Sequence, residues 1–144
     1  MAAPSGGGGG GGPVGFTGGV ASAGQGLSYI EDRCFAYSGA IGCSNSETTL
    51  LDFTTQQGTI IAKIKFAVAT PAAENDQMRV IFELNGTVVY RSLLYSGIGG
   101  TVYQSNRETV NVIIPPNSHW RVLGENITDA STRQLAVIIA GKVQ

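Results

Sequence analysis

The residue best suited to acid–base chemistry in this chain is its single histidine, which directly follows a serine. The two residues are Ser118 and His119, at the start of an apolar stretch. A serine nucleophile needs an adjacent base, and a third group must hold that base in place. Nothing in the spacing around the pair supplies the third group, so we expect a structural role for His119.

The acidic residues offer no alternative chemistry. Ten Asp and Glu residues are scattered along the 144 residues, without the Asp-x-Asp-x-Asp-Gly spacing of a calcium loop. A run of glycines near the start lacks the Lys-Ser/Thr ending of a phosphate-binding loop. We therefore expect no metal, no cofactor and no enzymatic activity.

Two cysteines, Cys34 and Cys43, are too few for a disulfide scaffold or a four-ligand zinc site. Their spacing would let a disulfide close a small loop if the protein reaches an oxidising environment. The alternative is a pair of reduced, half-buried thiols. The sequence leaves both interpretations open.

Three tyrosines, Tyr90, Tyr95 and Tyr103, cluster around a glycine-rich stretch at residues 97–100. Surfaces rich in Tyr and Gly suit contacts with proteins or sugars, so this stretch is a candidate surface-binding loop. The competing interpretation is that the tyrosines lie at the edge of a β-sandwich with their hydroxyls in water.

Two Asn-x-Ser/Thr tripeptides begin at Asn85 and Asn126. Such tripeptides arise often by chance, and Asn85 already has a sufficient role in an Asn-Gly turn. The first residues show neither a basic nor an apolar signal region, so the chain stays in the compartment that makes it, is released by lysis or has been processed beforehand. Without a secretory route we expect no glycosylation.

The chain has two parts that differ in composition, and these two parts must position the candidate residues described above. Residues 1–26 hold 12 of the 21 glycines and no ionisable side chain, so this segment cannot hold a shape by its own contacts. We interpret it as an uncharged arm that contacts neighbouring protein subunits, with a flexible linker as the alternative. The candidate assembly residues of the arm are Gly6, Gly7, Gly8, Gly9, Gly10, Gly11, Gly12 and Phe16.

Residues 27–144 alternate apolar and polar side chains with a period of two, which is typical of half-buried β-strands. Turn residues separate the strands, and Asn85-Gly86 predicts a tight hairpin. The sequence thus predicts an all-β domain, a single eight-stranded jelly roll or β-sandwich. The expected strands are 34–38, 48–54, 59–69, 77–84, 87–94, 109–114, 119–124 and 133–143.

The overall composition excludes two classes of partner. The formal net charge is −1 and only 13% of the residues are charged, so the basic surface that nucleic acid requires is absent. No apolar run approaches the roughly 18 residues of a membrane helix. We expect neither nucleic acid nor a membrane as partner.

Several strand and turn segments form a familiar pattern: 46–55 (SETTLLDFTT), 60–66 (IIAKIKF), 80–90 (VIFELNGTVVY), 113–117 (IIPPN), 122–126 (VLGEN) and 137–143 (VIIAGKV). Together they resemble the small single jelly-roll structural proteins encoded by aquatic viruses and phages. The resemblance covers residues 45–143 and implies a virion component, either a capsid-decorating protein, a penton protein or a small coat subunit. The glycine-rich start lies outside the shared pattern.

The leading hypothesis is a virion subunit that assembles with copies of itself and with other capsid proteins through its sandwich and its arm. A second hypothesis is a carbohydrate- or receptor-binding module, which rests on the tyrosine-rich loop. A third is a secreted trimer resembling the tumour-necrosis-factor jelly rolls, in which three glycine triplets near residue 15 would begin a collagen-like stalk.

Overall fold

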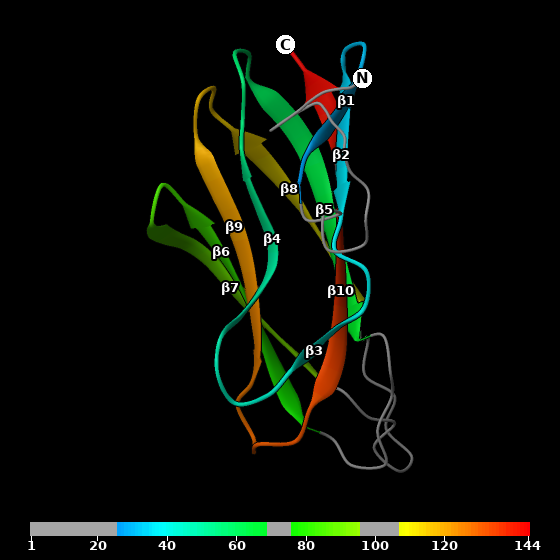
Figure 1. Ribbon diagram of the computed structural model, residues 1–144, viewed down its shortest axis with the longest axis vertical. Coiled ribbons are helices and arrows are strands. Elements are labelled where there is room, and N and C mark those ends of the chain that lie inside the picture. Colours follow the sequence, from blue (N-terminus) through cyan, green and yellow to red (C-terminus); the bar gives the residue numbers. More distant parts are fainter. Residues whose placement is uncertain (1–25, 69–75, 96–106) are drawn as a thin grey trace, which may run out of the picture.

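The computed structural model describes residues 26–68, 76–95 and 107–144 and forms an all-β fold (Figure 1). No helix in these three ranges is long and apolar enough to cross a membrane. The strands of the described chain are β1 (Ser28–Ile30), β2 (Arg33–Tyr37), β3 (Ile41–Cys43), β4 (Thr48–Thr54), β5 (Ile60–Val68), β6 (Gln77–Leu84), β7 (Thr87–Tyr95), β8 (Arg107–Ile114), β9 (His119–Asn126) and β10 (Arg133–Val143).

The expected count of about eight strands is too low, because ten strands are present in the described ranges. Each of the eight expected segments corresponds to an observed strand within two residues at either end. The two additional strands, β1 and β3, have three residues each. Three residues are too few to produce a recognisable alternation, which explains why the sequence pattern does not reveal them.

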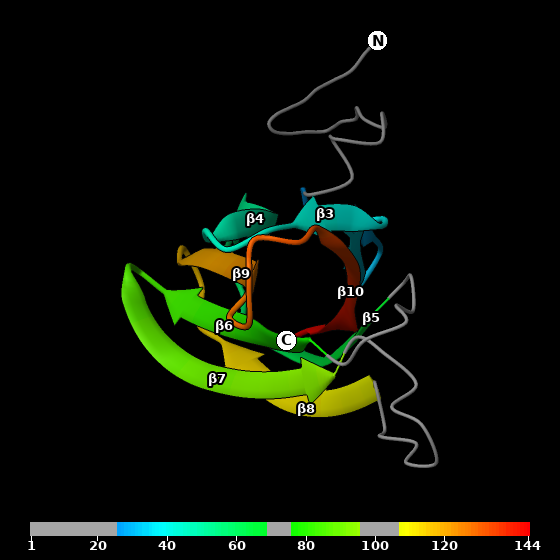
Figure 2. The same cartoon turned by 90° about the horizontal axis from the view of Figure 1, so that it is seen from below.

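The strands form two antiparallel sheets (Figure 1). One sheet has six strands in the order β1-β2-β10-β5-β8, with β3 paired to β10 beyond the end of β2. The other sheet has four strands in the order β4-β9-β6-β7. Viewed from below, the two sheets enclose the interior from opposite sides (Figure 2), so the domain is a β-sandwich.

The chain folds back on itself as a set of nested strand pairs. The innermost pair is the hairpin of β6 and β7, which turns at Asn85 and Gly86 with φ angles of 52° and 83°, as the Asn-Gly sequence predicts. Outside it lie the pairs β5 with β8, β4 with β9, and β2 with β10. Successive pairs belong to alternate sheets, so segments distant in sequence meet across the core.

The core lies between the sheets and follows the alternation of the strands. Trp120 and Phe82 pack with ring centroids 5.6 Å apart, and Phe66 of the opposite sheet meets Phe82 edge-on at 5.8 Å. A β-bulge between Thr49 and Leu51 lets two consecutive leucines of β4 become buried. Because the inner faces are filled, any site must lie on the outer faces or at the ends of the sandwich.

Candidate interaction surface

His119 lies on the outer face of the four-stranded sheet, where its ring Nε2 is 2.6 Å from Oδ1 of Asp52. Ser118 points elsewhere: it is buried, and its hydroxyl donates to the carbonyl of Pro116 at 3.2 Å. The described contacts therefore do not join the serine and the histidine. The partner of His119 follows from strand pairing, because Thr54 of β4 lies opposite His119 and Asp52 is two residues away on the same face.

Ion pairs link neighbouring strands across the outer face of the four-stranded sheet. Arg121 lies between two acids, with Nη1 at 3.0 Å from Oε1 of Glu83 and Nε at 3.7 Å from Oδ2 of Asp52. Arg79 binds Glu125 through its guanidinium, with Nε donating at 2.9 Å. Each of these contacts joins adjacent strands, so Arg79 and Arg121 are neutralised by acids on the neighbouring strands.

Two apolar side chains are buried on the same face. Ile81 and Leu123 lie outside the inter-sheet core cluster, yet each is only 2% exposed. They are opposite each other on β6 and β9, and the residues two positions away on their strands are the charged ones just described. Long charged side chains cover apolar neighbours with their alkyl stems, so the ion-paired side chains cover Ile81 and Leu123.

Among the described side chains, the charged residues on the strands of the six-stranded sheet's outer face are all basic. All three lysines of the chain, Lys63, Lys65 and Lys142, are exposed there, together with Arg33. Asp32, at the turn between β1 and β2, lies 3.7 Å from Arg33 and 3.8 Å from Lys142. No carboxylate within the described ranges pairs with Lys63 or Lys65.

Large apolar side chains are exposed between these cations. Ile61 and Ile113 are opposite each other on β5 and β8 and are 45% and 67% exposed. Ile138 of β10 lies opposite Tyr37 of β2, which is also exposed. The ring of Phe35 contacts that of Tyr37, with centroids 5.4 Å apart. This face is amphipathic, and within the described ranges no part of the chain covers it.

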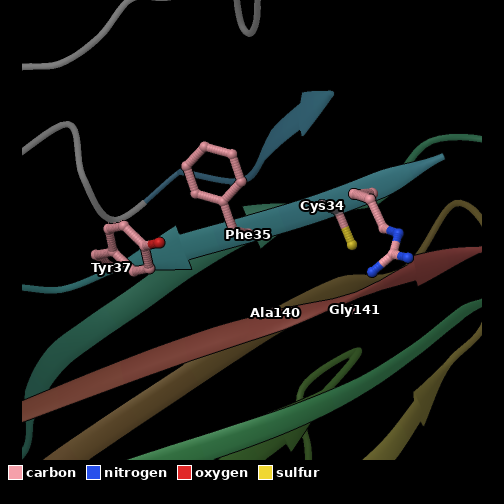
Figure 3. Close-up of a pocket in the computed structure, with 6 residues that line it drawn as sticks. Cys34, Phe35, Tyr37, Ala140 and Gly141 are labelled. Atoms are coloured by element: carbon pink, nitrogen blue, oxygen red, sulfur yellow. The ribbon is translucent and has the colours of Figure 1, made fainter. Parts of the chain in front are cut away.

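A shallow hollow of about 330 Å³ opens on this face between β2 and β10 (Figure 3). The small residues Ala140 and Gly141 of β10 lie beside the rings of Phe35 and Tyr37 on β2, and the difference in size creates the depression. Figure 3 shows that Phe35 and Cys34 leave β2 on opposite sides. Arg33 also lines the hollow and supplies a guanidinium.

Cys34 and Cys43 are both free and buried. Each pairs with β10, Cys34 opposite Gly141 and Cys43 opposite Arg133, eight residues away. Eight residues of strand span about 26 Å, far beyond the roughly 7 Å that a disulfide tolerates between Cα atoms. The reduced-thiol interpretation fits this register and the disulfide does not. Burial raises the pKa of Cys43 to about 11 and also raises the pKa of Cys34.

Tyr90 does not belong to a surface loop. It lies opposite Phe82 in the β6–β7 hairpin and packs against the core, with ring centroids 5.1 Å apart. Tyr95 ends β7, but its side chain, like all of Tyr103, lies outside the described residues. The arm residues fall outside them too: Gly6, Gly7, Gly8, Gly9, Gly10, Gly11, Gly12 and Phe16.

Asn126, which begins one of the two Asn-x-Thr tripeptides, is a buried hub at one end of the sandwich. It is 1% exposed, and its amide nitrogen donates to Asp76 at 3.0 Å and to the carbonyl of Ser131 at 2.8 Å. Its amide oxygen accepts from the backbone of Thr128 at 2.9 Å. An amide in this position organises the loop and is inaccessible to a glycan. Backbone hydrogen bonding from Ser131 lowers the pKa of the nearby Asp129.

Comparison with known proteins gives a fold and no family. No protein-family model matches the chain, and no curated protein sequence matches it. Tripeptidyl peptidase 2 is similar in structure with a TM-score of 0.55 and 7% identity, over 81% of this chain and 10% of the peptidase. Likeness at this identity concerns the fold alone, and this chain corresponds to a tenth of that protein.

Further similar structures have TM-scores below 0.5, and two of them serve as examples. They are an insecticidal delta-endotoxin of Bacillus thuringiensis (0.43, 11% identity, 73% of this chain and 20% of that chain) and the VP2 subviral particle of infectious bursal disease virus (0.44, 12% identity, 79% and 33%). The second is a viral capsid assembly, but a likeness this distant carries no argument about role.

Proposed function

We propose that this chain is a non-enzymatic structural protein of a virus particle, namely a decoration, penton or small coat subunit located in the virion. The strand order supports the proposal, because nested pairs that alternate between two antiparallel sheets are the arrangement of a jelly roll. The residue pattern over 45–143 supports it as well, through its resemblance to small jelly-roll virion proteins.

The observation that carries the proposal is the uncovered outer face of the six-stranded sheet. Exposed apolar residues are normal one at a time, but here they adjoin one another across neighbouring strands. Contiguous apolar area on a folded domain marks a surface that another protein covers. A structural subunit remains in contact with other subunits in the assembled particle, and this contact accounts for such a face.

The place where the arm begins also supports the proposal. Residues 1–26 precede β1, which is the edge strand of the six-stranded sheet. An arm that begins at this edge starts beside the uncovered face, and it reaches copies of the chain or other capsid proteins. Linking the two contacts in one chain multiplies weak affinities.

Mass photometry of the full chain beside a chain beginning at Ala21, with negative-stain imaging, tests this function. We expect discrete rings, shells or filaments from the full chain and none from the shorter one, while both melt with the same cooperative transition. If the full chain stays monomeric and binds no capsid of its source, the proposal is wrong.

The hollow on the six-stranded sheet favours one second candidate, a carbohydrate- or receptor-binding module on a virion or a secreted trimer. Two aromatic rings and a guanidinium at one depression suit a sugar that carries an acidic group. A glycan array with the unchanged protein and with Tyr37→Ala decides this. Saturable binding that the substitution weakens supports it, and a flat response excludes it.

A further inference from the structure

We propose that the outer face of the six-stranded sheet docks an acidic protein surface and that its hollow receives one side chain of that partner. This inference rests on the proposed function and deepens it, because it names the chemistry of the protein on the other side of the interface. Three features of the face support it: the sign of its charge, the kind of its apolar side chains and the shape of its hollow.

The charge of the face selects an acidic partner. Every lysine of the chain lies here, and Lys63 and Lys65 occupy β5, an interior strand of the sheet. Neither lysine is neutralised within the described part of the chain. On the other sheet, Arg79 and Arg121 have acids beside them. Unneutralised charge at the centre of a face steers a partner of opposite sign and repels one of the same sign.

The same charge disfavours a second copy that packs face to face. In a two-fold dimer each residue of the interface meets the matching surface of its symmetry mate. Lys63 and Lys65, on an interior strand, would then approach the basic side chains of the other copy, while Asp32, at the β1–β2 turn, is already paired with Arg33 and Lys142. The partner that we propose is therefore an acidic surface of another protein.

The apolar side chains select a protein over a polyanion. Ile61, Ile113 and Ile138 are branched aliphatic groups, and their burial requires an apolar surface opposite them. Nucleic acids and sulfated glycans offer phosphates or sulfates and stacking faces, which aliphatic side chains do not recognise. The two apolar pairs, Ile61 with Ile113 and Ile138 with Tyr37, lie beside the central lysines, and a protein surface offers both apolar groups and carboxylates to meet them.

The hollow fixes how the partner is oriented. Its floor is formed by Ala140 and Gly141 and its wall by the rings of Phe35 and Tyr37, so an apolar or aromatic side chain fits into it. Arg33 is the first residue of the same strand and also lines the depression. A guanidinium there pairs with a carboxylate that neighbours the inserted side chain.

Fluorescence anisotropy with a synthetic ten-residue peptide that alternates Glu with Val and contains one central Phe tests the inference on the full chain. We expect saturable binding that weakens more than tenfold between 50 and 500 mM NaCl. Lys65→Glu is expected to weaken it at least fivefold, and Tyr37→Ala at least threefold. Arg91→Glu is the matched control, because it makes the same charge change at an exposed site on the other sheet and should shift the affinity less than twofold.

Three outcomes would overturn the inference: no peptide binding up to 1 mM, equal weakening by Lys65→Glu and Arg91→Glu, or tighter binding to heparin, single-stranded DNA or phosphatidylserine vesicles than to the peptide. Circular dichroism melts of every variant ensure that a loss of binding is not a loss of folding. Particle assembly is measured separately. Assembly without peptide binding disproves only the partner chemistry, whereas peptide binding without assembly or capsid attachment disproves the proposed function.

Discussion

The two outer faces of the sandwich are built from the same kind of alternating strand, but they differ in ion pairing and in the exposure of their apolar side chains. On the four-stranded sheet, acids and bases on adjacent strands pair and cover Ile81 and Leu123. On the six-stranded sheet, Lys142 lies 3.8 Å from Asp32, but Lys63 and Lys65 have no acid beside them in the described part of the chain, and the isoleucines near them are exposed. The four-stranded sheet teaches that ion pairs within one chain can cover the apolar side chains of an outer face. Exposed isoleucines and unpaired lysines on the other sheet therefore indicate a surface that a partner covers.

The largest expected difference between the faces is in stability. Ile81→Ala removes a buried side chain and should lower the free energy of unfolding by about 3 kcal/mol. Ile61→Ala makes the same truncation at an exposed site and should cost about 1 kcal/mol or less. Urea unfolding of the two variants checks this, and equal losses would contradict the distinction between the faces.

A smaller difference is expected for single charges. Arg121→Ala separates Asp52 and Glu83 from their shared base and should cost about 1 kcal/mol, because the cations and acids form a network across three strands. The cost should shrink in 1 M NaCl, which screens the ion pairs. Urea unfolding at both salt concentrations measures it. A loss that is independent of salt would show that packing of the arginine stem, not charge, is responsible.

A third prediction concerns the inner side of the six-stranded sheet, which should be inaccessible to solvent although its outer face is exposed. Burial raises the pKa of Cys43 to about 11 from 9.0, so the folded protein keeps the thiol protonated where the unfolded chain ionises it. Its contribution to stability is complete below pH 9 and is lost as the pH rises towards 11, on the order of 1 kcal/mol by pH 10.

Urea unfolding between pH 8 and pH 10 follows this loss. The variant Cys43→Ala removes the titrating group, so its stability should fall less over the same interval. Identical slopes for the two proteins would contradict a sealed thiol. Slow reaction of both cysteines with iodoacetamide at pH 8 in the folded protein is the accompanying expectation.

The smallest effect on folding is expected at the unneutralised cations. Lys65→Gln should change the free energy of unfolding by less than about 0.5 kcal/mol, because the side chain is exposed and the described part of the chain offers it no ion pair. The measurement is again urea unfolding, beside Arg121→Ala. A cost as large as that of the arginine would place Lys65 in a stabilising network and weaken the case for a partner.

The long strands and the hairpin follow from the sequence because period-two alternation and Asn-Gly turns are local signals. The register between distant strands is not local. It brings Asp52 to His119, holds Cys34 and Cys43 apart along β10, and turns Tyr90 towards Phe82. The Tyr90 interpretation failed because a bulge beside Phe82 shifts the β6–β7 register, and nothing in the sequence marks that bulge.

Part of the lysine-rich face could be predicted from the sequence. Lys63 and Lys65 are the polar positions of a strongly alternating segment, and Lys142 follows the same alternation in the last strand. What the sequence lacks is the information that β5 and β10 are neighbours, and this places the lysines together. The glycine-rich arm lies outside the described residues, so its role stays a prediction.

Amine acylation of the lysines, read by mass spectrometry, tests the central claim most directly because all lysines lie on the face in question. The isolated chain and the particle that it forms or joins are treated with the same dilute acylating reagent. We predict that Lys63 and Lys65 react at least fivefold more slowly in the particle, with Lys142 protected as well. Unchanged reactivity of all three lysines in the particle would contradict the assignment of this face as the docking surface.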